Sequence, residues 1–149
     1  MSEQRFARRA ATESNRLPSI YQADTWSAVV AADAPSARQA HTLVWTGREV
    51  VVWGGSIAGG AATNTGGRYD PGYSNGGADA WTATSSSSGA PSARVWHTAV
   101  WTGRRMIVWG GSSDSGTTAL ASGGRYDPQA DTWIATDASG RSIEKFATL

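Results

Sequence analysis

The sequence predicts an all-β protein built from repeated four-stranded antiparallel units. Two segments, Pro35–Ser56 and Pro91–Ser112, begin 56 residues apart and are identical at 16 of 22 positions. After a stretch rich in Gly, Ala, Ser and Thr, both copies reach the same phrase, GRYDP, at Gly67–Pro71 and Gly124–Pro128. A fixed period of this length indicates a repeat architecture, in which each unit buries its apolar faces against neighbouring units.

The pattern within each repeat has a period of two rather than 3.6, which favours strands over helices. In the second copy, His97–Trp101 and Arg105–Trp109 are dense in Val, Ile, Trp and Thr, and a polar turn with Gly103 separates them. This pattern predicts a β-hairpin. A third strand is expected at Gly123–Asp127, where Pro128 ends the ladder because proline has no N–H to donate.

A fourth strand is expected at Asp131–Thr136, and a turn cluster like Ser85–Arg94 separates one unit from the next. Four short antiparallel strands per unit, repeated along the chain, indicate blades of a β-propeller. The chain then divides into a basic N-terminal tail (1–18), the remnant of a preceding blade (19–34), two complete blades (35–84 and 91–136) and a C-terminal tail (137–149). The N-terminal tail reads as a loose segment or as a short helix through Arg16.

Composition excludes several classes of protein. The net charge of +1 suggests neither a nucleic-acid partner nor an anionic membrane. No apolar run approaches the ~20 residues of a membrane span. The absence of cysteine excludes disulfides, thiolate metal sites and a cysteine nucleophile. The N-terminus lacks the apolar core of a secretory signal, and the sequence leaves the compartment open.

The order Arg-x-x-His, apolar strand, Gly-Gly, Tyr-Asp-Pro and Asp-x-Trp resembles the Kelch repeat, from about Ser19 to Thr136. The resemblance implies a Kelch-type propeller with two full repeats and a partial one. The matching residues are Arg38, His41, Gly54, Gly55, Tyr69, Asp70, Pro71 and Trp81 in the first unit, and Arg94, His97, Gly110, Gly111, Tyr126, Asp127, Pro128 and Trp133 in the second.

Most of these residues are expected to be structural. The glycine pairs allow close backbone approach and unusual dihedral angles; a phosphate cradle would need a following Gly-Lys-Ser/Thr and a helix. Tyr69 and Tyr126 are expected to pack within a blade with the hydroxyl bonded to backbone. We expect Trp81 and Trp133 to fill the space between adjacent blades, with ligand stacking as the alternative.

His41 and His97 are the only histidines in the chain, and the repeat makes them equivalent. A metal pair is conceivable, but each would begin an innermost strand in its own blade, without a cysteine or a matched carboxylate nearby. Structural hydrogen bonding is the favoured interpretation. We therefore expect no metal, no cofactor and no catalytic residue.

Arg38 and Arg94 are the candidate ligand-binding residues. The Kelch resemblance implies that they lie in the loop that enters the innermost strand, on the face where the central channel opens. There a planar guanidinium would suit the carboxylates of an acidic peptide. The structural alternative is an arginine that ties its loop to a neighbouring blade. The variable loops Ser56–Thr65 and Ser112–Ser122 are expected on the same face, where binding specificity usually lies.

Two blades do not close a propeller, which needs roughly 4–8 of them. In addition, Tyr21–Trp26 matches the end of a preceding unit whose other strands are absent. The chain is therefore a piece of a longer array, a protomer that assembles with its own copies (three would give six blades), or an open arc that other proteins complete. The orphan strand favours the first explanation.

These features predict a non-enzymatic binding or scaffold protein for a protein, peptide or carbohydrate ligand. The alternative is a fragment of a Kelch-type carbohydrate-active enzyme, similar to galactose oxidases, without a catalytic site of its own. The radical-copper oxidases of that group use a tyrosine cross-linked to cysteine. This chain has no cysteine and cannot form that cofactor.

Overall fold

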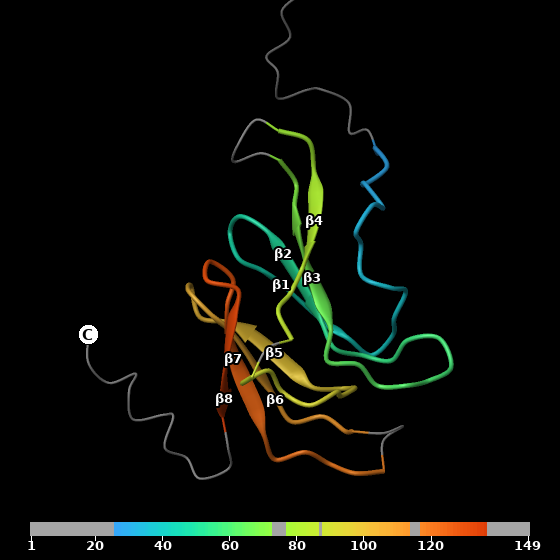
Figure 1. The fold of residues 1–149 in the computed structure, drawn as a ribbon, viewed down its shortest axis with the longest axis vertical. Coiled ribbons are helices and arrows are strands. Elements are labelled where there is room, and N and C mark those ends of the chain that lie inside the picture. Colours follow the sequence, from blue (N-terminus) through green and yellow to red (C-terminus); the bar gives the residue numbers. More distant parts are fainter. Residues whose placement is uncertain (1–25, 73–76, 87, 114–116, 137–149) are drawn as a thin grey trace, which may run out of the picture.

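The computed structural model describes residues 26–72, 77–86, 88–113 and 117–136, which form two four-stranded antiparallel sheets and no helix (Figure 1). In both sheets the strand order follows the chain order. Sheet 1 consists of β1 (Thr42–Trp45), β2 (Val50–Trp53), β3 (Gly66–Asp70) and β4 (Ala80–Ala83), and sheet 2 consists of β5 (Thr98–Trp101), β6 (Met106–Trp109), β7 (Gly123–Asp127) and β8 (Thr132–Thr136).

The all-β prediction is confirmed. Strand β7 covers the expected residues, and β5, β6 and β8 each begin one residue later than the sequence predicts. The orphan strand Tyr21–Trp26 falls mostly outside the described residues. Its last residue, Trp26, lies outside any strand and is fully exposed. The two tails, 1–18 and 137–149, also lie outside the described residues.

The two sheets have matching registers. Thr42 pairs with Trp53 in sheet 1, and their repeat equivalents Thr98 and Trp109 pair in sheet 2. The dense β-branched content of β2 and β6 suits a pleated, buried strand. Because the ladders match, every strand residue of sheet 1 has an equivalent in sheet 2, on the same face.

Each sheet has two faces, which the register defines because directly paired residues point the same way. We call one the leading face and the other the trailing face. The leading face carries Trp45, Val50, Tyr69 and Trp81 in sheet 1 and Trp101, Met106, Tyr126 and Trp133 in sheet 2. The trailing face carries Val44, Val51, Trp53 and Arg68 in sheet 1 and Val100, Ile107, Trp109 and Arg125 in sheet 2.

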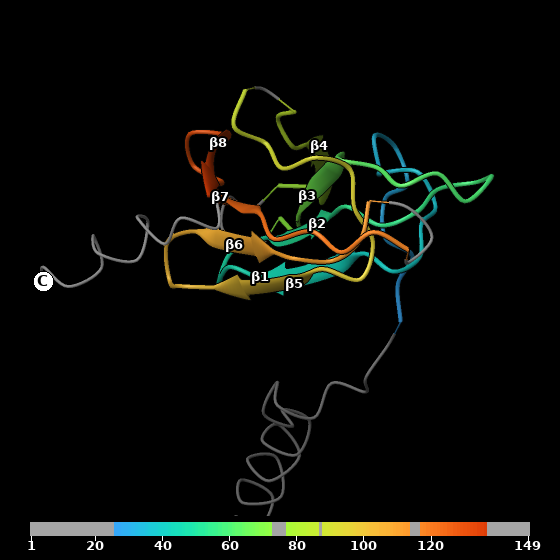
Figure 2. The ribbon, with the colours of Figure 1, turned by 90° about the horizontal axis from the view of Figure 1, so that it is seen from below.

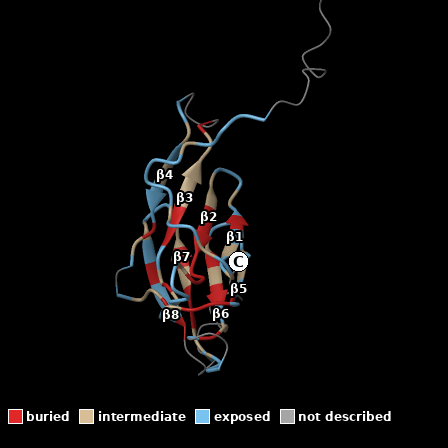
Figure 3. Cartoon of the chain, turned by 90° about the vertical axis from the view of Figure 1, so that its right-hand side faces the viewer, coloured by how far each residue is buried: buried red, intermediate tan, exposed pale blue. Residues whose placement is uncertain are grey.

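The core lies where the trailing face of sheet 1 meets the leading face of sheet 2, with β1 beside β5 (Figure 2). Trp53 is fully buried there, and its ring centroid lies 5.1 Å from that of Trp133. Burial is greatest on the strands near this contact, and β4 is mostly exposed (Figure 3). The buried cluster consists of Val44, Val51, Trp53, Met106, Val108, Tyr126 and Trp133.

The connections lie on two sides of the molecule (Figure 1). The β2–β3 and β6–β7 loops share one side, and isolated bridges tie them to the residues that follow the two arginines, Gln39 to Ser56 and Val95 to Ser112. We call this the loop side. The β1–β2 and β5–β6 hairpin turns lie on the opposite, turn side. In the described residues, no helix is long and apolar enough to cross a membrane.

Candidate functional site

Arg38 and Arg94 use all their side-chain donors within their own repeat. The Arg94 guanidinium donates to the carbonyls of Ser92, Gly110 and Ser122 at 2.7–3.0 Å and to the hydroxyls of Ser92 and Ser122. Arg38 makes the equivalent five bonds, to Ser36, Gly54 and Thr65. A guanidinium has five N–H groups, so no donor remains for a ligand carboxylate.

The burial of Arg94 points in the same direction, since its side chain has 0% exposure. These contacts favour the structural alternative that the sequence left open, with one difference. The side chains of Arg38 and Arg94 fasten the β2–β3 and β6–β7 loops of their own repeats, rather than a neighbouring sheet. The loop side therefore has a rigid base, and its candidate binding residues are residues other than these two arginines.

The paired glycines have the unusual dihedrals that the sequence predicts. Gly54 and Gly55 have φ angles of 69° and 90°, and Gly110 and Gly111 have 71° and 82°. A Cβ on Gly55 would lie 2.6 Å from the carbonyl oxygen of Gln39, so a larger residue would push the loop away from its base. The glycines thus permit the close packing of the loop side.

The two histidines have different surroundings although the repeat makes them equivalent. His41 is exposed, whereas His97 is 5% exposed between the sheets. The Nε2 atom of His97 lies 2.7 Å from the Thr42 hydroxyl oxygen, and the ring packs edge-on against Trp53. Burial, with smaller contributions from Arg94 and His41, lowers the pKa of His97 to about 4. A neutral His97 is therefore part of the contact between the sheets.

Each sheet also has a carboxylate and an indole that bind the backbone N–H and the carbonyl of a single residue of the incoming chain. In sheet 2, Asp131 accepts the Ser85 N–H at 2.8 Å, and the Trp133 indole donates to the Ser85 carbonyl at 3.0 Å. Asp131 also accepts the hydroxyl of Tyr126. We call Tyr126, Asp131 and Trp133 the sheet 2 clamp.

In sheet 1, Tyr69, Asp79 and Trp81 form the equivalent clamp on Val30. The bonds from Val30 and Tyr69 lower the pKa of Asp79. The sequence predicted backbone partners for the two tyrosine hydroxyls, but both hydroxyls bond a carboxylate. The recurring Asp-x-Trp pattern was the available signal, because it places the carboxylate directly before β4 or β8 and two residues before the indole.

A hollow of about 340 Å³ lies on the loop side between the repeats, lined by Gln39, Ala40, Ser56, Gly60, Val95 and Trp96. Trp96 is 61% exposed at its edge. Its backbone has a φ of 53°, as has Ala40, its repeat equivalent. Bulky residues seldom adopt this conformation, and here it recurs in both repeats. Sequence reasoning missed Trp96, although it is the one bulky aromatic residue that replaces a small residue within the conserved Arg-x-x-His phrase.

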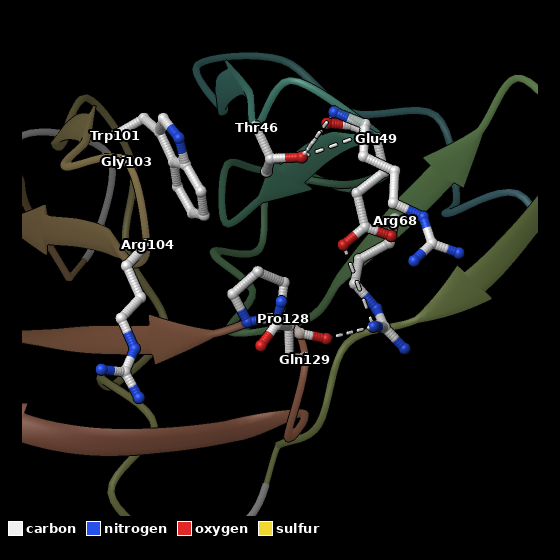
Figure 4. Close-up of a pocket in the computed structure, with 9 residues that line it drawn as sticks. Thr46, Glu49, Arg68, Trp101, Gly103, Arg104, Pro128 and Gln129 are labelled. Carbon is white, nitrogen blue, oxygen red and sulfur yellow. Dashed lines mark hydrogen bonds and ion pairs between the residues drawn. The ribbon is translucent and has the colours of Figure 1, made fainter. Parts of the chain in front are cut away.

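A second hollow, of about 450 Å³, lies on the turn side between the two hairpins (Figure 4). Trp101 and Arg104 stand on one wall, and Glu49 and Arg68 on the other. Arg68 donates to the carbonyl of Pro128 across the sheets and lies 4.0 Å from Glu49. Burial raises the pKa of Glu49.

The turn-side hollow therefore contains an arginine that ties the two sheets together, with one carboxylate beside it. Its lining holds no second carboxylate and no histidine, so it offers no pair of groups for acid–base exchange. In the described part of the chain, no group of three or more His, Asp or Glu side chains is placed to hold a metal ion.

No protein-family model matches the sequence. No curated protein matches it either.

Proposed function

We propose that this chain is a section of a Kelch-type β-propeller that acts as a non-enzymatic binding scaffold. Its two sheets would be adjacent blades, and the loop side would hold a protein, peptide or carbohydrate ligand. Three features support this proposal: the matched ladders, the glycine-lined loop bases, and the equivalent clamps in the two repeats.

One observation carries the ligand-binding part of the proposal, the exposed Trp96 at the edge of the loop-side hollow. A large, rigid aromatic side chain beside a concave surface can bury much ligand area at low entropic cost. The amide of Gln39 and the hydroxyl of Ser56 line the same hollow and could set the orientation of a bound group.

Further blades would complete the scaffold. The leading face of sheet 1 and the trailing face of sheet 2 expose apolar side chains that include Trp45 and Trp109. Contiguous apolar patches of this kind mark interaction sites. Their occupants would be copies of this chain or flanking blades from a longer propeller.

The test of ligand binding compares Trp96→Ala with Trp26→Ala, which removes another exposed tryptophan away from the hollow. The probes are immobilised oligosaccharides and peptides, screened with the parent chain first. Loss of a central aromatic anchor weakens binding by about tenfold or more. We expect this loss in Trp96→Ala only.

Equal binding by both variants would overturn the assignment of the loop-side hollow. The absence of any binding by the parent chain would overturn the ligand-binding scaffold itself. Turnover of any sugar in the panel would instead favour the enzyme-fragment alternative.

A further inference from the structure

The contact between the two sheets is a template for a contact that the described part of the chain does not make within itself. The trailing face of sheet 1 packs on the leading face of sheet 2. The repeat places the same kind of trailing face on sheet 2 and the same kind of leading face on sheet 1, and both are open. We propose that a second copy of this chain docks head to tail, with the trailing face of its sheet 2 on the leading face of sheet 1.

Exposure shows which residues lack a neighbour. On the trailing face, Val44 and Trp53 of sheet 1 are 8% and 0% exposed, while Val100 and Trp109 of sheet 2 are 49% and 43% exposed. The ladder positions are the same, so the difference comes from the presence or absence of a facing sheet. Ile134, beside this surface, is 47% exposed.

The leading face shows the reverse pattern. Met106 of sheet 2 is fully buried, whereas Leu43 and Trp45 of sheet 1 are 58% and 50% exposed. The clamps cover the outer part of this face in both sheets, because Val30 and Ser85 lie over the equivalent tryptophans. What stays open on sheet 1 is therefore the part that a neighbouring sheet covers on sheet 2.

Polar groups are matched as well as apolar ones. Within the chain, Arg68 of sheet 1 donates to the Pro128 carbonyl of sheet 2. Its equivalent Arg125 makes no such bond to a facing sheet in the described part of the chain, and the Nε of both arginines is buried without a hydrogen-bond partner there. The equivalent of Pro128 is Pro71, at the end of β3. A docked copy would thus give Arg125 Nη1 a carbonyl acceptor equivalent to the one that Arg68 Nη1 has at Pro128.

The histidine contact has an open counterpart too. Thr42 and His97 meet between the sheets at 2.7 Å. Their equivalents are Thr98 on the trailing face of sheet 2 and His41 near the leading face of sheet 1, and both are exposed. Head-to-tail docking would bring this second pair together. Docking of two like faces would place threonine opposite threonine and would leave His41 unused.

The N-terminal residues are compatible with this docking. Trp26 is the repeat equivalent of Trp133, so residues 26–29 correspond to part of β8 in the docked copy. In the structure these four residues form no strand and are largely exposed, so β8 of the second copy would replace them at the outer position.

Head-to-tail contacts are heterologous, and they generate a ring where the rotation between units closes. Propellers close with roughly 4–8 blades, so a ring would contain two to four copies, and three copies would give six blades. The proposal rests on the scaffold proposed above, but the two are tested separately. Assembly is read from mass and ligand capture from Trp96, so either can fail alone.

The experiment measures absolute mass by light scattering on a sizing column, with circular dichroism on each peak. Trp109→Glu places a charge on the trailing face of sheet 2, and Trp45→Glu places one on the leading face of sheet 1. Ala61→Glu is the control, because it adds the same charge at an exposed position of the loop side. We expect a discrete assembly of two to four copies for the parent and the control, and a folded 15.6 kDa monomer for each face variant.

Mixing the two face variants gives the decisive measurement. Each variant retains one intact face, so head-to-tail docking predicts a 1:1 dimer in the mixture and none in either variant alone. Arg125→Ala should weaken parent assembly by about tenfold, the cost of leaving the Pro71 carbonyl unpaired.

Several results would overturn the proposal. A folded parent monomer at all concentrations, or an aggregate without a discrete mass, would assign the open faces to blades other than copies of this chain. Self-association retained by one face variant alone would indicate docking of like faces. Mass unchanged in both variants would place the contact elsewhere.

Discussion

Trp53 and Trp109 occupy the same position in their repeats and in their ladders, yet the first is fully buried and the second is 43% exposed. Trp53 packs on His97 and Trp133 of the other sheet, whereas Trp109 has no sheet opposite it in the described part of the chain. The comparison shows that a repeat encodes a unit with two apolar faces, and that burial depends on the neighbour the unit meets.

The largest expected effect is on the buried member of this pair. Trp53→Ala should lower the free energy of unfolding by about 3–5 kcal/mol, because it removes a large side chain from the only contact surface between the described sheets. Trp109→Ala should cost under about 1 kcal/mol in the monomer, where the residue is half exposed. Urea unfolding followed by tryptophan fluorescence and circular dichroism measures both values.

Equal losses for the two tryptophan variants would contradict the comparison. They would mean that Trp109 is also buried in solution. Dilution below the assembly concentration distinguishes a partner chain from a different packing of sheet 2.

The same comparison applies to the two equivalent histidines, because the buried His97 makes the free energy of unfolding depend on pH. The pKa of His97 is lowered from 6.5 to about 4 by burial, so protons bind more tightly to the unfolded chain. The stabilising effect of a neutral His97 is therefore complete above pH 6.5 and is lost as the pH falls toward 4. The loss amounts to about 3 kcal/mol over that range.

We expect His97→Gln to remove most of this slope in the free energy of unfolding between pH 6.5 and 4. His41→Gln is the matched control when both variants are measured below the assembly concentration, where this histidine is exposed and the slope should remain. The measurement is a series of urea unfolding curves at fixed ionic strength. A slope that follows His41 instead would contradict the assignment.

Effects smaller than that of Trp53→Ala are expected at the clamps. Asp131→Ala should cost about 1–3 kcal/mol, because the Ser85 N–H and the Tyr126 hydroxyl lose their acceptor at the connection between the sheets. Asp79→Ala should cost less, because Val30 belongs to the segment that precedes sheet 1. Thermal unfolding of both variants tests the order, and a larger loss for Asp79→Ala would reverse it.

Much of the fold could be predicted from local sequence. The runs Thr98–Trp101 and Met106–Trp109, rich in Val, Ile, Trp and Thr, determined a hairpin together with the Gly-bearing turn between them. The repeat then determined that sheet 1 and sheet 2 share a register. The glycine pairs were predicted for the same local reason, since φ angles near 70–90° exclude most other residues.

The candidate site was harder to predict, as three cases show. The sequence does not distinguish an arginine whose donors are used within its repeat from one that is free to bind a ligand. For Arg94, only the positions of the Gly110 and Ser122 carbonyls decide that its donors are used. The acceptors of the tyrosine hydroxyls also depend on the spacing of two strands. Trp96 became a candidate because of its exposure, which depends on where the neighbouring repeat lies.

The sequence by itself determined the strands, their register and the equivalence of the two units, because these depend on the alternation of side chains and on backbone conformation along a short stretch of chain. The tertiary structure decided that Trp53 is buried and Trp109 is not, and that burial lowers the pKa of His97. It also decided that Arg68 bonds a carbonyl of the facing sheet. These properties depend on the sheet that stands opposite. For the leading face of sheet 1 and the trailing face of sheet 2, no sheet stands opposite in the described part of the chain.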